Sequence, residues 1–260
     1  MIARIRAAGL VWPTLMTIVG LAILVSLGTW QMNRKTWKDS LVERIAARIA
    51  AAPRPLAAVV DGGTAAGDIE YARVEARGRY RHDGEQFLYA PHPKLGPGFH
   101  VVTPLQLEVP AGAPSRVVLV NRGWVPEALR DPARRPAGQV TGAVAVTGLV
   151  RLQGEHGAFT PGNDPGKNLW YWRDIPALAK AAAPADAGSV LPVTIDAEAE
   201  PANPGGWPKG GTTEIKLPNR HLEYALTWYG LAAAMLAVFG VYAWGRLTSP
   251  RPAQRERHIR

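Results

Sequence analysis

The sequence contains no cysteine among its 260 residues. This absence excludes disulfide bonds, cysteine-ligated zinc, iron–sulfur clusters and thiolate copper sites. Methionine is also scarce, with four residues including Met1, which argues against a thioether copper site. Any metal chemistry of this chain therefore depends on histidine.

The motifs of several enzyme classes are missing as well. None of the five serines lies in a G-x-S-x-G pattern, and neither H-E-x-x-H nor a phosphate-binding glycine loop occurs. Because the sequence offers no nucleophile and no acid–base constellation, we expect a protein that is not an enzyme.

Two long runs without charge are present. Leu10 to Gly28 spans 19 residues, and Tyr224 to Trp244 spans 21. As helices, both reach roughly 30 Å, the thickness of the hydrocarbon core of a bilayer. Tryptophan and tyrosine lie near the ends of both runs, as in the aromatic belts of membrane interfaces. We therefore predict two transmembrane helices in a lipid bilayer, in preference to two buried core helices.

The formal net charge of +9 is concentrated outside these runs. Seven arginines against Glu256 give the tails, residues 1–9 and 245–260, a charge of +6, whereas residues 29–223 carry +3. The positive-inside rule then predicts two cytoplasmic tails and a periplasmic central segment in a bacterial inner membrane. A signal peptide cleaved after the first run is the alternative. No basic stripe remains in the centre, so nucleic acid is not an expected partner.

The central segment has the residue pattern of a β-rich domain. A helix is predicted over Lys38–Ala52, ended by Pro53 and Pro55. Short strands joined by turns then predict a mostly antiparallel sheet or a partly closed barrel. The fold class is thus an α+β membrane protein, with two transmembrane helices flanking an extracytoplasmic domain. The expected strands are Tyr71–Tyr80, Glu85–Ala90, Phe99–Val109, Arg116–Asn121, Val140–Arg151 and Val190–Ala197, with a short helix over Ile175–Ala183.

Four of the histidines lie in loops of the central segment. His92 and His100 flank a Pro/Gly-rich loop and can converge on a metal, although loop histidines are more often solvated. His82 and His156 stand in polar turns, where we expect them to be exposed.

His221 differs because it stands at the outer end of the second apolar run. On a helix it shares one face with Tyr224, Ala225 and Trp228. An imidazole beside two aromatic rings can ligate iron while the rings pack against a porphyrin. The same residues can equally form an ordinary aromatic cluster at the headgroup level.

Aromatic residues also gather in two segments of the central domain. These are Trp170-Tyr171-Trp172-Arg173-Asp174 and Asn121-Arg122-Gly123-Trp124. Three successive rings cannot all lie on one face of a strand. The two segments form either core rings with a salt bridge or a docking surface, since Trp, Tyr and Arg favour interfaces.

Four motifs follow one another along the chain. They are Leu27-Gly28-Thr29-Trp30-Gln31 with Arg34, Val120-Asn121-Arg122-Gly123-Trp124-Val125-Pro126, the segment from Pro161-Gly162-Asn163 through Asp174, and Asn219-Arg220-His221-Leu222-Glu223-Tyr224-Ala225-Leu226-Thr227-Trp228-Tyr229. In order and spacing they resemble L-G-x-W-Q-x-x-R, V-N-R-G-W-V-P, Asn…Trp…Asp and N-x-H-x-x-Y-x-x-T-W-Y of the Surfeit locus protein 1 family of cytochrome c oxidase assembly factors. The resemblance covers the chain from about Leu10 to Trp244.

The resemblance implies a protein that assists the assembly of haem–copper terminal oxidases. It would bind haem a through His221 and aid its placement in the catalytic subunit, with a haem a synthase as a further partner. Arg220 stands where members of the family often carry an acidic or amide residue. The remaining motif residues would contact partners or hold the fold: Trp30, Gln31, Arg34, Arg122, Gly123, Trp124, Trp170, Trp172 and Asp174.

A scaffold without haem is the competing interpretation. Such a protein would stabilise the oxidase subunit through its Trp-rich domain and through a seam of small residues on the second apolar helix. That seam consists of Gly230, Ala233, Ala234 and Ala237.

Overall fold

The computed structural model describes residues 6, 8–62, 66–92, 95–213 and 219–248. The chain divides into two compact units, one of residues 1–43 and 216–260 and the other of residues 44–215. Two long helices dominate the first unit, and a β-barrel forms the second. The predicted fold class is therefore confirmed.

The first unit contains helix α6 (His221–Thr248) and most of helix α2 (Val11–Ala50). Both helices are long and apolar enough to cross a membrane. Helix α2 unites the first predicted span and the predicted helix over Lys38–Ala52 in one helix of 40 residues, which ends before Pro53. At 1.5 Å per residue it is about 60 Å long, so its apolar half can span a bilayer core while its polar half extends beyond.

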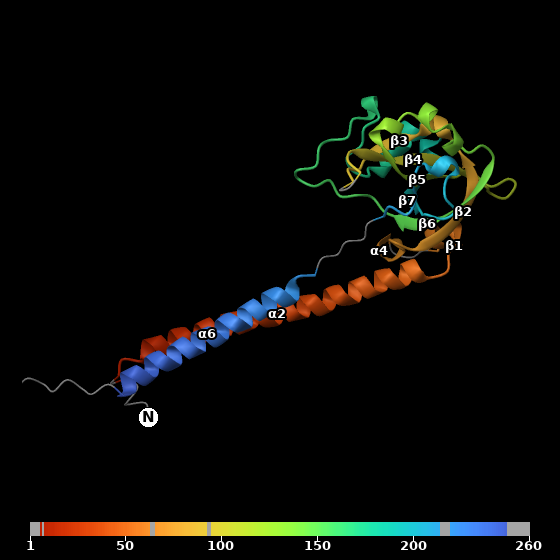
Figure 1. Cartoon of the computed structure of the whole chain (residues 1–260). Coiled ribbons are helices and arrows are strands. Elements are labelled where there is room, and N and C mark those ends of the chain that lie inside the picture. Colours follow the sequence, from red (N-terminus) through yellow and green to blue (C-terminus); the bar gives the residue numbers. More distant parts are fainter. Residues whose placement is uncertain (1–5, 7, 63–65, 93–94, 214–218, 249–260) are drawn as a thin grey trace, which may run out of the picture. The chain divides into compact units, whose positions relative to one another are not determined.

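The two helices lie side by side and antiparallel (Figure 1). At Gly28, an added Cβ atom would lie 2.6 Å from the ring of Tyr229, whose hydroxyl is 3.2 Å from Oγ1 of Thr29. The less exposed residues of α6 recur at intervals of four and three, as in a coiled-coil seam. They are His221, Ala225, Trp228, Ala232, Met235, Phe239 and Ala243.

Seven strands form the sheet within the described part of the second unit: β1 (Arg54–Pro55), β2 (Arg73–Tyr80), β3 (Gln86–Tyr89), β4 (Gly98–Leu107), β5 (Val117–Pro126), β6 (Ala143–Arg151) and β7 (Val190–Ala197). The connections hold helices α3 (Leu56–Val60), α4 (Ala66–Ile69) and α5 (Ile175–Ala182). They also hold the 3-10 turns η1 (His82–Gly84), η2 (Glu127–Leu129), η3 (Pro132–Arg134), η4 (Pro136–Gly138), η5 (Pro165–Lys167), η6 (Pro184–Ser189) and η7 (Pro204–Gly206). Strand β5 is longer than predicted because its pairing with β4 continues as far as Pro126.

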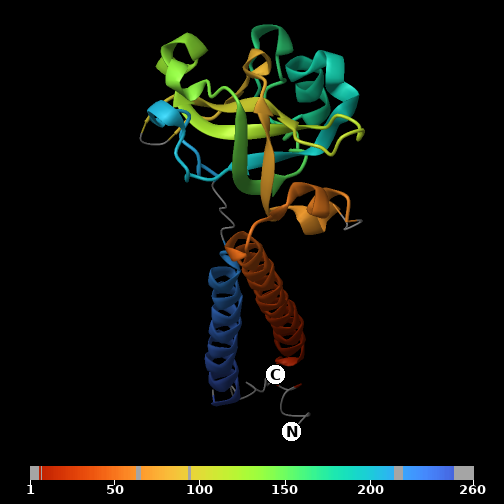
Figure 2. The same cartoon turned by 90° about the vertical axis from the view of Figure 1, so that its right-hand side faces the viewer.

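Five of these strands close into a barrel (Figure 2). The strand order is β1-β2-β6-β7-β5-β4-β3, and an additional pairing of β2 with β4 completes the ring. Only β5 and β7 are parallel among the neighbours within the ring. Closure pairs both edges of every strand in the ring, which removes the free edges of an open sheet.

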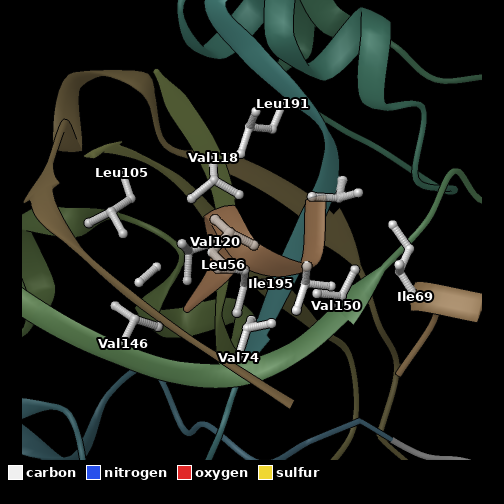
Figure 3. Close-up of a cluster of buried hydrophobic side chains, with 13 residues drawn as sticks. Leu56, Ile69, Val74, Leu105, Val118, Val120, Val146, Val150, Leu191 and Ile195 are labelled. Atoms are coloured by element: carbon white, nitrogen blue, oxygen red, sulfur yellow. The ribbon is translucent and has the colours of Figure 1, made fainter. Parts of the chain in front are cut away.

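Apolar side chains at every second strand position fill the barrel (Figure 3). On β5, Val118 and Val120 belong to this core. Leu119 lies on the opposite face of the strand, where it packs with Trp170 and with Leu178 of α5. Strand β5 is therefore covered on both faces. The core residues are Leu56, Val59, Ile69, Val74, Ala76, Leu105, Val118, Val120, Val146, Val150, Leu191, Val193 and Ile195.

The contact between Gly28 and Tyr229 makes the helix pair sensitive to side-chain size. We predict that Gly28→Leu lowers the stability of the helix pair by about 1–3 kcal/mol, because the new side chain would overlap the Tyr229 ring. The measurement is thermal unfolding of the full chain in a non-ionic detergent. Gly230→Leu is the matched control, because a Cβ atom there meets nothing within 4 Å. Equal losses in both variants would contradict the prediction.

Candidate functional site

The first candidate site contains the polar residues that follow the first apolar run and precede the second. The Nδ1 atom of His221 lies 2.7 Å from Oε1 of Gln31 on α2. The backbone N–H of His221, at the start of α6, donates to the side chain of Asn219 over 3.3 Å. Asn219 in turn donates to Asp39 over 2.7 Å. The first and last sequence motifs are thus joined by a hydrogen bond across the helix pair.

The hydrogen bond to Gln31 determines which nitrogen of His221 carries the proton. With the amide oxygen of Gln31 facing Nδ1, the ring nitrogen must donate, since an amide oxygen only accepts. The neutral ring then keeps a lone pair on Nε2, which makes no hydrogen bond within the described residues. This is the state in which an imidazole binds a metal ion.

The aromatic residues predicted to flank His221 differ in exposure. Trp228 is half-buried in the helix seam, whereas Tyr224 is 53% exposed at its border. Ala225 is fully buried, so the space beside this small side chain is already filled. On α2, Trp30 is exposed, and the Arg34 guanidinium stacks on Trp37 at 4.0 Å from the ring centroid.

The β5 motif places a fully buried arginine in the barrel domain. The Arg122 side chain has no exposed surface and donates to Oε1 of Glu85 over 3.2 Å and to the carbonyl oxygen of Gly138. Its guanidinium carbon lies 4.6 Å from the centroid of the Tyr80 ring. Arg135 donates to the other Glu85 oxygen over 2.5 Å. One buried carboxylate thus holds two arginines.

His82 belongs to the same cluster, which corrects the expectation that it is exposed. Its Nδ1 atom lies 3.3 Å from Oε1 of Glu85, and its Nε2 atom lies 2.9 Å from the carbonyl oxygen of Val140. The turn η1 points the ring inward because a buried carboxylate needs partners. His156, in contrast, is exposed as expected.

The next residues of the motif bring β5 against a distant loop. Gly123 has a φ of 124°, and a Cβ atom there would lie 1.9 Å from the carbonyl oxygen of Lys209. Only glycine therefore fits at this position. Trp124 is 3% exposed and donates from Nε1 to the carbonyl oxygen of Ala90 over 2.7 Å.

The third motif is also built into the barrel domain. Trp170 is fully buried and donates to Oε1 of Gln86 over 3.0 Å, whereas Trp172 is half-buried beside His156. Asp174 caps helix α5, because its side chain accepts from the backbone N–H of Ala177. These rings lie on different sides of their segment, as three successive aromatic residues require.

Two of the histidines, His92 and His100, lie at the same cavity of the barrel domain. His92 and His100 both line a cavity of about 490 Å³, together with Trp124 and Asp196. In the described part of the chain, no three histidine or carboxylate side chains are placed to hold a metal ion. His100 is partly buried, and this burial lowers its pKa despite the nearby Asp196 carboxylate.

Known proteins match this chain over most of its length. A model of the SURF1 family matches residues 18–233. The chain belongs to the SURF1 family. A SURF1-like protein of Monosiga brevicollis is 38% identical over 246 residues, which cover 90% of this chain and 87% of the relative. Surfeit locus protein 1 of Mus musculus is 38% identical over 228 residues, covering 82% of this chain and 70% of the relative. That of Homo sapiens is 36% identical over 224 residues, covering 80% and 70%. The resemblance inferred from the motifs is thereby confirmed.

The sequence did not predict the buried ion clusters of this SURF1-family chain. The sequence left open whether the segment around Arg122 forms core with a salt bridge or a docking surface. In the structure Arg122 and Arg135 bind Glu85, which lies 37 and 50 positions before them in the chain. The signal available in the sequence was a charged residue inside an otherwise apolar strand, which requires a buried partner. That signal identifies the arginine but does not show which carboxylate it binds.

The Glu85 cluster also predicts a pH dependence of stability. Burial alone would raise the pKa of Glu85. Hydrogen bonds from His82 and Arg135, and the charges of Arg135 and Arg122, outweigh burial and lower the pKa from 4.5 to about 2. A carboxyl group with a lowered folded-state pKa stabilises the fold above its unfolded-state pKa and loses that contribution as the pH falls. The loss is about 3 kcal/mol, spread between roughly pH 4.5 and pH 2.

The test compares chemical unfolding of the wild type with that of Glu85→Gln at a series of pH values. We expect the variant to be less stable at pH 7 and to lose less further stability between pH 4.5 and pH 2. Glu155→Gln, at an exposed position, should keep the wild-type profile. Parallel profiles for Glu85→Gln and the wild type would refute the assignment.

Proposed function

We propose that this SURF1-family chain is an assembly factor for a haem–copper terminal oxidase such as cytochrome c oxidase. In this proposal it binds haem a and assists the insertion of haem a into the catalytic subunit. The chain lies in a bacterial inner membrane with both tails cytoplasmic and the barrel periplasmic, and a haem a synthase is a further partner. The observation that carries the haem assignment is the Nδ1–Gln31 hydrogen bond of His221, which leaves Nε2 as a ligand.

The donor set around His221 fits one axial haem ligand. Gln31 holds Nδ1 and fixes the ring orientation, while Nε2 is neither buried nor hydrogen-bonded among the described residues. An imidazole held in this way is a stronger and better oriented ligand than a freely rotating one. His221 would hold the iron of a bound haem through its Nε2 atom.

The surroundings of His221 suit an amphipathic, anionic ligand. The exposed Tyr224 and the half-buried Trp228 offer aromatic surface, and Arg220 is an exposed cation next to the histidine. Aromatic rings can pack against a porphyrin, and an arginine can pair with a propionate carboxylate. These residues lie at the N-terminal end of the second apolar run, where a largely apolar ligand can leave the bilayer.

The proposed activity is handover, in which no covalent bond of the porphyrin is made or broken. A carrier must bind firmly enough to take up haem and weakly enough to release it to the oxidase. A single histidine ligand supported by one neutral hydrogen bond meets this requirement better than two strong axial ligands. Transfer then follows from the higher affinity of the oxidase site.

A scaffold without haem is the second candidate function, and one observation favours it. The seam of Gly230, Ala233, Ala234 and Ala237 is exposed on α6, on the side opposite the residues that face α2. Small residues of this kind allow close approach of another transmembrane helix. A purified wild-type protein without a Soret band, obtained from cells that make haem a, would favour this candidate.

Replacement of His221 tests the haem ligand directly. We predict that His221→Ala, purified from cells that make haem a, contains at least about tenfold less haem than the wild type, because the axial bond is lost. The measurements are haem per protein chain and the amount of assembled oxidase. His156→Ala, at an exposed histidine of the barrel, should leave both unchanged. Equal haem content and equal assembly in His221→Ala and the wild type would overturn the assignment.

Replacement of Gln31 tests the support of the ligand. Gln31→Leu removes the acceptor for Nδ1–H, so we expect haem affinity to fall by about 10–100-fold, the range found for such supporting residues. Gln31→Glu should restore binding and lower the reduction potential of the bound haem, because a carboxylate makes the imidazole more basic. Met32→Leu, at the neighbouring exposed position, is the control. Unchanged affinity and potential in both Gln31 variants would show that this bond is only structural.

A further inference from the structure

The cavity of the barrel domain has no part in the proposed haem site. Its volume is about 490 Å³, and its wall includes Leu88, His100, Trp124, Arg151, Arg173 and Asp196. Three of these residues are charged, although Asp196 is 3% exposed and the side chains of Arg151 and Arg173 are 21% and 14% exposed. Charged groups are costly to bury, so a cluster of them around a cavity calls for an explanation.

Asp196 is the counter-ion of this cluster and has no accepting capacity to spare. Arg151 donates to it over 2.9 Å and Arg173 over 3.1 Å. Asn121 and Thr213 donate over 3.0 and 2.9 Å. Burial acts to raise the pKa of Asp196, but the two guanidinium charges lower it below its usual value. The carboxylate is therefore ionised and saturated, and it holds the two arginines side by side.

The second carboxylate near the cluster is used in the same way. Glu70 accepts from Nε of Arg151 over 2.9 Å and from the backbone N–H of Leu152 over 2.7 Å. It balances the second arginine charge, but it does not belong to the cavity wall. Both carboxylates are thus occupied by donors from the protein itself.

Several guanidinium donors remain unused at the cavity. Within the described residues, Arg173 donates only from Nη2, and Arg151 only from Nε and Nη1. The remaining nitrogens, Nε and Nη1 of Arg173 and Nη2 of Arg151, are not among the sealed, unpartnered atoms of the structure. Solvent or a ligand can therefore reach them. The charged part of the wall offers donors and no free carboxylate oxygen.

Apolar and aromatic side chains line another part of the same cavity. Trp124 is fixed by its hydrogen bond to Ala90, and the ring centroid of His92 lies 5.7 Å from that of Trp124. Leu88 adds an aliphatic side chain to the wall. An arginine fork matches the geometry of an oxyanion, and an apolar wall with an aromatic ring suits a flat apolar group.

We propose that this cavity binds a small oxyanion, a carboxylate or a phosphate, carried on a flat apolar body. Arg173 and Arg151 bind the oxyanion, and the apolar part of the wall, which includes Leu88 and the His92 ring, contacts the body. The ligand is a small molecule distinct from the iron that His221 would bind, and the site lies wholly within the barrel domain.

Calorimetric titration of the full chain in a non-ionic detergent tests the proposal. The probes are benzoate, phenyl phosphate and inorganic phosphate. We expect saturable binding of benzoate or phenyl phosphate, and the tighter of the two identifies the oxyanion. Inorganic phosphate should bind at least about tenfold more weakly, because it lacks the apolar body. No saturable binding of either aromatic probe at millimolar concentration would overturn the proposal, and so would inorganic phosphate binding as tightly as they do.

Three variants locate the binding. Arg173→Lys keeps the charge but loses the planar fork, so affinity should fall about tenfold or more. Thr212→Trp fills the cavity from a wall residue that makes no bond to Asp196, so binding should be lost while thermal stability remains. Arg116→Lys, in the ion pair with Asp61 outside this cavity, should bind like the wild type. Wild-type affinity in Thr212→Trp would refute the location. All three variants keep Gln31 and His221, so their haem content tests the proposed function independently.

Discussion

A strand without an exposed face must find a partner for every polar side chain that it carries, and β5 imposes this constraint on the barrel domain. Val118 and Val120 lie in the barrel core, while Leu119 lies under α5. The following Asn121 and Arg122 are still buried, so water cannot satisfy them. Their partners come from β7 and from the loop before β3, which are Asp196 and Glu85. Each of these carboxylates gathers further arginines, and the strand thereby fixes the loops around it.

The helix pair obeys a different constraint, because its helices have few polar groups to satisfy. Their packing depends on shape, with Gly28 making room for the ring of Tyr229. The hydrogen bond between Gln31 and His221 lies one helical turn beyond this contact on α2. The packing of the helices at Gly28 therefore supports the hydrogen bond, because it brings the side chains of Gln31 and His221 within bonding distance.

Much of the architecture could be predicted because it depends on local patterns. The length and apolar character of the two runs predict the helices, and Gly and Pro punctuation predicts the strands, with β7 matching its expected bounds of Val190 and Ala197. Local patterns contain no information about which residues meet across the fold. His82 stands in a polar turn and still points at Glu85, and Gln31 lies 190 positions from His221. Barrel closure through β2 and β4 is a long-range pairing of the same kind.

The candidate site was predicted in part for the same reason. His221 could be singled out because its position at the end of an apolar run is visible in the sequence. The state of its ring could not, because the tautomer depends on the acceptor that α2 supplies. The cavity of the barrel was suggested only through His92 and His100. Its arginines, Arg151 and Arg173, are brought to one place by Asp196, far from both in sequence.

The distribution of satisfied and unsatisfied polar atoms separates the motif residues into two groups. Trp124 and Trp170 donate their indole N–H groups to the protein itself, and Asp174 caps a helix, so these residues hold the fold. The Nε atom of Arg122 has no partner in the described part of the chain, but its side chain is sealed from solvent, where no ligand reaches it. Among the described residues, Nε2 of His221 has no partner and is accessible, and some donors of the Arg151 and Arg173 pair are in the same state. Water hydrates an accessible polar atom of this kind until a ligand replaces it, whereas an atom already bonded within the protein has no capacity to offer a ligand. This contrast is the physical reason for placing binding at His221 and in the barrel cavity, and for assigning the tryptophan-rich motifs to the fold.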